Sequence, residues 1–193
     1  MVSRLKRLLR ALERDDVRSI SRRYFISNGF DGALTSVGIA VGSYLSGVPD
    51  GVTVFKIGIG AAIGLTTSGV WSVWEIERAE KRAELTRIEH PLLTDLTETQ
   101  IQRQKAGARQ VNALMSGIGP VIGVVFPMVP FLLEGTLLGL RDATLVSLGV
   151  AVSILFVFGA YLADISKQNW IVAGARMGLA GIVVALLNIL LPG

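Results

Sequence analysis

Five long apolar stretches constrain the fold of this chain more than any other feature of its sequence. They cover approximately residues 25–47, 52–74, 111–133, 143–164 and 169–191. A helix of about 20 residues crosses the hydrocarbon core of a bilayer, so each stretch is long enough to span a membrane. Residues 111–133 contain no charged side chain at all. We therefore predict an all-α integral membrane protein with five transmembrane helices.

The distribution of lysine and arginine predicts how the chain is oriented. Eight of these residues precede the first span and seven lie in residues 75–110. The loop after the first span has none before Lys56, and the loop after the third span has only Arg141. Because cytoplasmic loops carry the excess of basic residues, the N-terminus and residues 75–110 are predicted to be cytoplasmic and the C-terminus outside.

The chain accordingly divides into four parts. Residues 1–23 predict a basic amphipathic cytoplasmic helix on the inner leaflet, because its leucines recur at helical spacing at Leu5, Leu8, Leu9 and Leu12. Residues 24–74 hold transmembrane helices one and two, residues 75–110 a short cytoplasmic helical insert, and residues 111–193 transmembrane helices three to five. A cleaved signal peptide is the competing interpretation of the N-terminus, but no small-residue cleavage site is clear.

The residue types limit the chemistry that is open to the chain. It contains no cysteine, which excludes thiolate chemistry, and the single histidine, His90, disfavours a histidine-built metal site. A metal ion would be bound by oxygen ligands. The pI is near 9.8, but the basic residues flank apolar spans, so the expected partner is the lipid bilayer and not a nucleic acid. No prosthetic group is predicted.

Asp31 places a carboxylate inside the first apolar stretch. A charge at membrane depth costs at least about 2.5 kcal/mol unless it is paired or hydrated, so such residues are candidates for function. Asn28 and Thr35 lie three residues before and four residues after Asp31, on the same helix face. This polar stripe predicts a transport pathway. The alternative is a structural ion pair with Arg176 of the last span, for which Asp164 competes.

The third apolar stretch contains three prolines, of which Pro127 and Pro130 lie close together near its end. Proline removes a backbone donor and frees the carbonyl one turn back. Free carbonyls beside a polar cavity can bind a cation in transit, so both prolines are included in the predicted pathway. An ordinary helix kink filled by a neighbouring helix is the alternative.

Acidic residues recur in the cytoplasmic insert, which we predict to form two helices broken at Pro91. Their spacing places several carboxylates on one helix face and predicts a metal site built from Glu77, Glu80, Glu84, Asp95 and Glu98. The alternative is a solvated helix held by salt bridges, since Glu77 and Lys81 have the favoured spacing for an ion pair. Glycines four residues apart predict close helix packing, within the chain or across a dimer, at Gly38/Gly42, Gly60/Gly64, Gly119/Gly123 and Gly174/Gly178.

The segments "NGFDGALTSVGIAVG" in the first span and "PMVPFLL" in the third, with the acidic insert after the second, resemble the vacuolar iron transporter family. The resemblance implies a five-span homodimer that exports ferrous or manganous ion from the cytosol in exchange for protons. It also implies that Asp31 binds the metal and the proton, and that Glu77, Glu80 and Glu84 gather the metal.

The second span differs from the family pattern. Thr66 and Thr67 stand where the family has a Ser-Met pair, so a soft methionine ligand is missing and two hydroxyls join the predicted pathway. Oxygen ligands suit manganese, magnesium or calcium at least as well as iron.

Two other classes of function are weighed against a transporter. A non-transporting membrane scaffold or lipid-surface protein with the same fold is the main alternative. An enzyme is not predicted, because no nucleophile and base can be paired. The positive-inside polarity and the short chain fit a prokaryotic plasma membrane.

Overall fold

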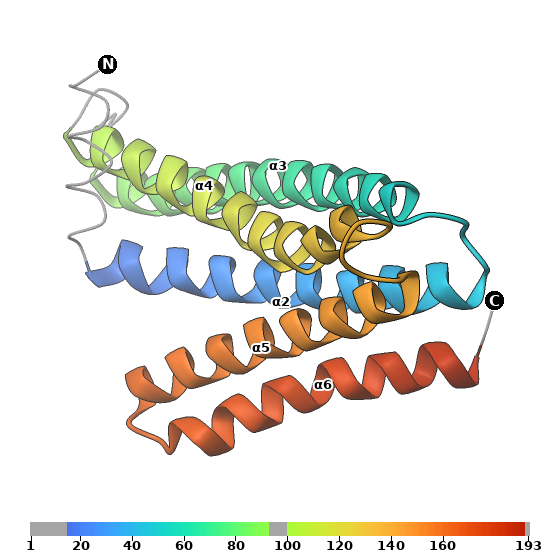
Figure 1. Ribbon diagram of the computed structural model, residues 1–193. Helices are drawn as coiled ribbons and strands as arrows, with labels where there is room; N and C mark the ends of the chain where they lie inside the picture. Colours follow the sequence, from blue (N-terminus) through green and yellow to red (C-terminus); the bar gives the residue numbers. More distant parts are fainter. Residues whose placement is uncertain (1–14, 93–99, 192–193) are drawn as a thin grey trace.

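The structure, a computed structural model, describes residues 15–92 and 100–191 (Figure 1). Within these ranges the chain forms α2 (Asp15–Leu45), α3 (Gly51–Leu92), α4 (Gln100–Met128), α5 (Leu140–Ser166) and α6 (Trp170–Leu190), with a 3-10 turn, η1 (Val129–Leu133), after α4. Apart from an isolated bridge between Glu134 and Leu138, helix is the only regular structure in the described ranges. The predicted all-α class is confirmed.

The helices lie side by side and alternate in direction along the chain. In Figure 1, α2 lies in the middle of the bundle, with α3 and α4 on one side and α5 and α6 on the other. It contacts all four other helices and packs most extensively against α4. Helix α2 also carries Asp31, the carboxylate that the sequence predicts for the transport pathway.

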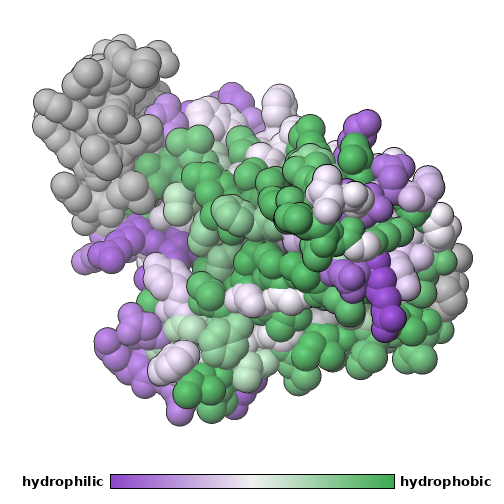
Figure 2. Space-filling model, viewed as in Figure 1, coloured by the Kyte–Doolittle hydropathy of each residue, from purple (hydrophilic) through white to green (hydrophobic). Residues whose placement is uncertain are grey.

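Four helices of the described chain are long and apolar enough to cross a membrane. These segments are residues 51–84, 107–133, 140–166 and 170–190, which correspond to the second to fifth predicted spans. Helix α2 is not among them, since Asn28, Asp31 and several hydroxyl residues interrupt its apolar stretch. On the face shown in Figure 2, apolar residues cover the middle of the molecule and hydrophilic residues gather toward its ends.

Helices α2 and α4 pack backbone against backbone. A Cβ atom added at Gly119 would lie 2.7 Å from the backbone nitrogen of Gly29, and one added at Gly123 would lie 2.7 Å from that of Ala33. Both distances are far inside van der Waals contact, so only glycine fits. The Gly119/Gly123 pair therefore serves packing within the chain.

The other glycine pairs have different environments. Gly174 packs against the ring of Phe156 on α5, and Gly178 contacts Val152 of the same helix. Gly60 and Gly64 of α3 are exposed, and a Cβ atom at either would meet nothing within 4 Å in the described chain. The Gly174/Gly178 pair thus packs α6 against α5, whereas the Gly60/Gly64 pair packs against none of the described residues.

Two predicted boundaries are not breaks in the structure. Helix α2 runs unbroken from Asp15 to Leu45, so the predicted boundary at residues 23–24 falls inside one continuous helix. The division into a surface helix and a first span stays a prediction, and the leucines of residues 1–14 lie outside the described residues. Helix α3 is 42 residues long, so it continues past residue 74 without a break and ends at Leu92, one residue after Pro91. Neither glycine nor proline occurs in residues 75–90 to stop it.

The connection between α2 and α3 is fixed by a capping aspartate. The backbone N–H and the hydroxyl of Thr53 donate to the Asp50 carboxylate at 2.8 and 2.9 Å. These hydrogen bonds, the backbone one first, hold the pKa of Asp50 below its usual range. They satisfy a donor that the first turn of a helix otherwise leaves free, so they fix where α3 begins.

Candidate transport site on helix α2

Along the helix axis, Asp31 lies at the level of the apolar middle of the bundle, as its neighbours on α2 show. A Cβ atom added at Gly29 would lie 2.8 Å from the ring of Phe158 on α5, and one at Gly32 would lie 2.9 Å from Pro120 of α4. Phe158 precedes the end of α5 at Ser166 by about 12 Å of helix, at 1.5 Å per residue. Asp31 is therefore well removed from the helix ends.

The Asp31 side chain is exposed on the surface of the bundle. Among the residues that the structure describes, Arg176 forms an ion pair neither with Asp31 nor with its competitor Asp164, and the side chains of Arg176 and Asp164 are exposed as well. The hydroxyl of Thr35 donates to the backbone carbonyl of Asp31 at 2.7 Å, so this hydrogen bond goes to the helix backbone and not to the Asp31 carboxylate. The structural ion pair considered above does not form within the chain.

Asn28 connects three helices one turn before Asp31. Its Nδ2 donates to the hydroxyl of Ser116 on α4 at 2.5 Å and to the Ser116 carbonyl at 3.4 Å. On α3, a Cβ atom added at Gly69 would lie 3.4 Å from the same Nδ2. Ser116 is fully buried, and the sequence analysis missed its role. A serine within an otherwise apolar span was the signal that could have found it.

The two threonines of α3 lie close to the level of Asn28. Thr66 donates its hydroxyl to the carbonyl of Gly117 on α4 at 3.3 Å, whereas the side chain of Thr67 is exposed. Gly69 follows Thr66 and Thr67 by less than one helical turn and lies next to Asn28. The two threonines are therefore close to the part of α2 that carries Asp31. Of these predicted pathway residues, Asp31 and Thr67 are the exposed ones.

The prolines lie elsewhere, toward the end of the bundle where α4 gives way to η1. Pro127 is fully buried in the last turn of α4, and Pro130 is buried in η1. Around them, Met128 and Phe131 belong to an apolar cluster that includes Val54 of α3. These surroundings favour the ordinary helix distortion over a cation site, and a transport role for the prolines stays a prediction.

Glu77 is buried between α3 and α4, with only 4% of its surface exposed. It accepts a hydrogen bond from Nδ2 of Asn112 at 2.9 Å and pairs with Nζ of Lys81 at 3.0 Å. Beside it, the guanidinium of Arg109 stacks on the ring of Trp74 at 4.1 Å from the ring centroid. The sequence analysis missed Asn112, which is 1% exposed and stands alone as an amide in its apolar span.

The other acidic residues of the predicted metal site differ from Glu77 in what the structure describes of them. Glu80 and Glu84 are exposed on α3, whereas Asp95 and Glu98 lie outside the described residues. Across the described ranges, no group of three acidic or histidine side chains is close enough to hold a metal ion. Metal binding by these carboxylates stays a prediction.

The buried Glu77 pair makes a testable contribution to stability. We expect Glu77→Ala to lower the Tm by about 3–12 °C, because a buried hydrogen bond to a charged group contributes about 1.5–3 kcal/mol and the Asn112 amide would lose its partner. Thermal unfolding in detergent, followed by tryptophan fluorescence, would measure the shift. Glu75→Ala is the control: Glu75 is exposed, and its pair with Arg78 spans 3.7 Å. Equal shifts for the two variants would contradict a clamp at Glu77.

Four helices of spanning length and an apolar outer surface define the chain as an integral membrane protein whose environment is a lipid bilayer. The chain belongs to the VIT family, since the family model matches residues 73–191, from within α3 to just past α6. This is a family of membrane transporters and not of enzymes. The resemblance inferred from the sequence is confirmed.

One curated relative can be compared over most of the chain. An uncharacterized protein from Methanocaldococcus jannaschii is 29% identical over 168 residues, which cover 86% of this chain and 85% of that protein. No solved structure matches this chain. The family match begins after Asp31, so the role of Asp31 rests on its position in the structure.

Proposed function

We propose that the chain exports divalent metal cations of the iron or manganese class from the cytosol, in exchange for protons, as a homodimer with five spans. In this proposal α2 is the first of the five spans and joins the four apolar helices α3 to α6. The N-terminus is cytoplasmic in a prokaryotic plasma membrane. The observation that carries the proposal is Asp31, an exposed carboxylate at membrane depth that has no ion-pair partner among the described residues. An unpaired charge within the membrane is costly, so its presence indicates a function.

The position of α2 supports its assignment as a span. It runs alongside the four apolar helices for most of their length and contacts all of them (Figure 1). A helix surrounded in this way needs less hydropathy than one that faces lipid, because its polar side chains can bond to neighbours. Asn28 does so with Ser116.

The dimer is supported by surfaces that the single chain leaves uncovered. Asp31 on α2 is exposed, and Gly60 and Gly64 on α3 are exposed glycines against which none of the described residues packs. A second copy over these surfaces would shield Asp31 from lipid and use the glycines for close helix contact. Two Asp31 carboxylates and nearby hydroxyls such as Thr67 would then supply hard oxygen ligands for a divalent cation. A carboxylate that holds either a proton or a cation couples the two.

A non-transporting membrane scaffold is the second candidate, and specific contacts favour it. The side chains of Asn28, Thr66 and Glu77 each form a hydrogen bond to α4 within the chain. If this pattern extended to the whole protein, the polar residues would hold helices together and would move no ion.

Flux through the wild-type protein in proteoliposomes separates the two candidates. We expect manganese and ferrous ion to cross, with cobalt as a third test ion, and flux to rise when an imposed pH gradient drives protons the opposite way. Protein-free liposomes and liposomes with the gradient collapsed are the controls. A folded protein in known orientation that moves none of the three ions would support the scaffold. Ion flux that ignores the pH gradient would retain the transporter and remove proton exchange.

A further inference from the structure

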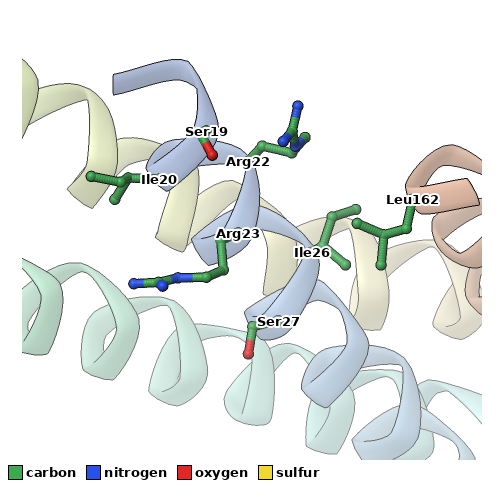
Figure 3. Close-up of a pocket in the computed structure, with 7 residues that line it drawn as sticks. All are labelled: Ser19, Ile20, Arg22, Arg23, Ile26, Ser27 and Leu162. Carbon is green, nitrogen blue, oxygen red and sulfur yellow. The ribbon is translucent and has the colours of Figure 1, made fainter. Parts of the chain in front are cut away.

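A pocket of ≈ 350 Å³ lies beside the N-terminal part of α2, and its lining ends at Ser27, one turn before Asp31 (Figure 3). It is lined by six residues of α2 and one of α5, namely Ser19, Ile20, Arg22, Arg23, Ile26, Ser27 and Leu162. Leu162 lies one turn before the end of α5 at Ser166, and α6 begins nearby with the exposed Trp170. Tryptophan is enriched where a membrane meets water, so the pocket lies at the level expected for lipid headgroups.

The lining combines cationic and apolar groups. Arg22 and Arg23 extend from α2 on different sides of the pocket in Figure 3, while Ile26 and Leu162 lie next to each other at one edge. No acidic residue lines the pocket, and neither arginine takes part in the Glu75–Arg78 or Glu77–Lys81 ion pair of the described residues. Arg23 instead lies 5.7 Å from the ring centroid of Tyr24. Among the residues that line the pocket, the positive charge of the two arginines therefore has no carboxylate beside it.

We propose that this pocket binds an anionic phospholipid, with the headgroup phosphate between the two arginines and an acyl chain along Ile26 and Leu162. Guanidinium groups bind phosphate oxygens through paired charge-assisted hydrogen bonds, and the Ser19 hydroxyl adds a further donor at the pocket. Basic pockets between helices at the membrane surface bind anionic headgroups for this reason. A free phosphate ion shares the headgroup chemistry, but it would leave the apolar edge uncovered.

Native mass spectrometry of the purified full chain in a nonionic detergent tests the proposal. The probes are phosphatidylglycerol, the neutral lipid phosphatidylcholine, and inorganic phosphate. We expect phosphatidylglycerol to bind tightest, and Arg22→Gln or Arg23→Gln to weaken its binding about fivefold each and about 25-fold together. Both arginines lie at the surface end of α2, so the variants are expected to keep the wild-type Tm.

Two matched variants separate a site from general attraction. Arg18→Gln removes the same charge one turn earlier on α2, but Arg18 does not line the pocket, so we expect binding to change less than twofold. Leu162→Asn makes the apolar edge polar, and we expect it to weaken phosphatidylglycerol binding but not phosphate binding.

Three results would overturn the proposal. If Arg18→Gln weakens lipid binding as much as Arg22→Gln, the attraction is a property of the basic surface and not of the pocket. If inorganic phosphate binds as tightly as phosphatidylglycerol and Leu162→Asn has no effect, the ligand is a free anion. If the double arginine variant binds phosphatidylglycerol like wild type, the two arginines of the pocket do not bind the lipid headgroup.

Discussion

Replacing Asp31 with asparagine is expected to abolish cation flux and to leave the fold intact. The substitution keeps the size of the side chain but removes the negative charge that would hold the cation at membrane depth. Removing one member of a desolvated charge pair typically costs about 2–5 kcal/mol, which corresponds to a loss of roughly 30-fold or more in affinity. Flux of manganese or ferrous ion in proteoliposomes, normalised to folded protein, is the measurement.

Stability decides between the transport role of Asp31 and a structural one. Because the described chain gives Asp31 no ion pair with Arg176, we expect Asp31→Asn to keep the wild-type Tm within a few degrees. Asp164→Asn is the matched control, since it neutralises an exposed carboxylate at the end of α5, where no transport role is proposed, and flux should persist. A variant that loses Tm and flux together, with Arg176→Gln losing the same, would instead point to an ion pair.

Substitution of Gly123 is expected to have the largest effect on folding. Gly123→Ala places a methyl group against the backbone of Gly29 and Ala33 on α2, where no flexible side chain can move aside. Overpacking of this kind costs about 1–3 kcal/mol, so we expect the Tm to fall by about 2–12 °C. Gly123→Leu should prevent recovery of a monodisperse protein, because α2 and α4 could not reach their packing distance.

A second glycine controls for the change in residue type. Gly149 of α5 is exposed, and an added Cβ atom would meet nothing within 4 Å, so Gly149→Ala should keep or raise the Tm through its better helix propensity. Thermal unfolding of both variants in the same detergent gives the comparison. A Gly123→Ala protein as stable as wild type would mean that α2 and α4 pack less closely than the structure shows.

The sequence predicted the helices better than it predicted their partners. Long apolar stretches identify α3 to α6, because spanning a bilayer requires length and hydropathy that can be counted along one chain. The central place of α2 could not be predicted in this way. It depends on Gly119 and Gly123 of α4 meeting Gly29, and the spacing of a glycine pair does not say which helix it faces.

The candidate site was predicted in part for a similar reason. A carboxylate within an apolar stretch is visible in any sequence, so Asp31 was found. The use of Asn28 and Thr66 as links to α4 was not, because a hydrogen-bonding side chain on a helix can face a cavity or a neighbour equally well. Glu77 shows the same limit, since its burial against Asn112 depends on a contact between residues 35 positions apart.

The length of α3 has a mechanical consequence. Its 42 residues extend for about 63 Å at 1.5 Å per residue, roughly twice the thickness of the hydrocarbon core of a bilayer. In the proposed membrane orientation, the C-terminal part of α3 extends beyond the bilayer, so this unbroken helix would act as a lever. A ligand or partner that tilts the part outside the bilayer would also tilt the part inside it, at the turn that carries Thr67. Binding events in the aqueous phase would thus reach the middle of the membrane along a single helix.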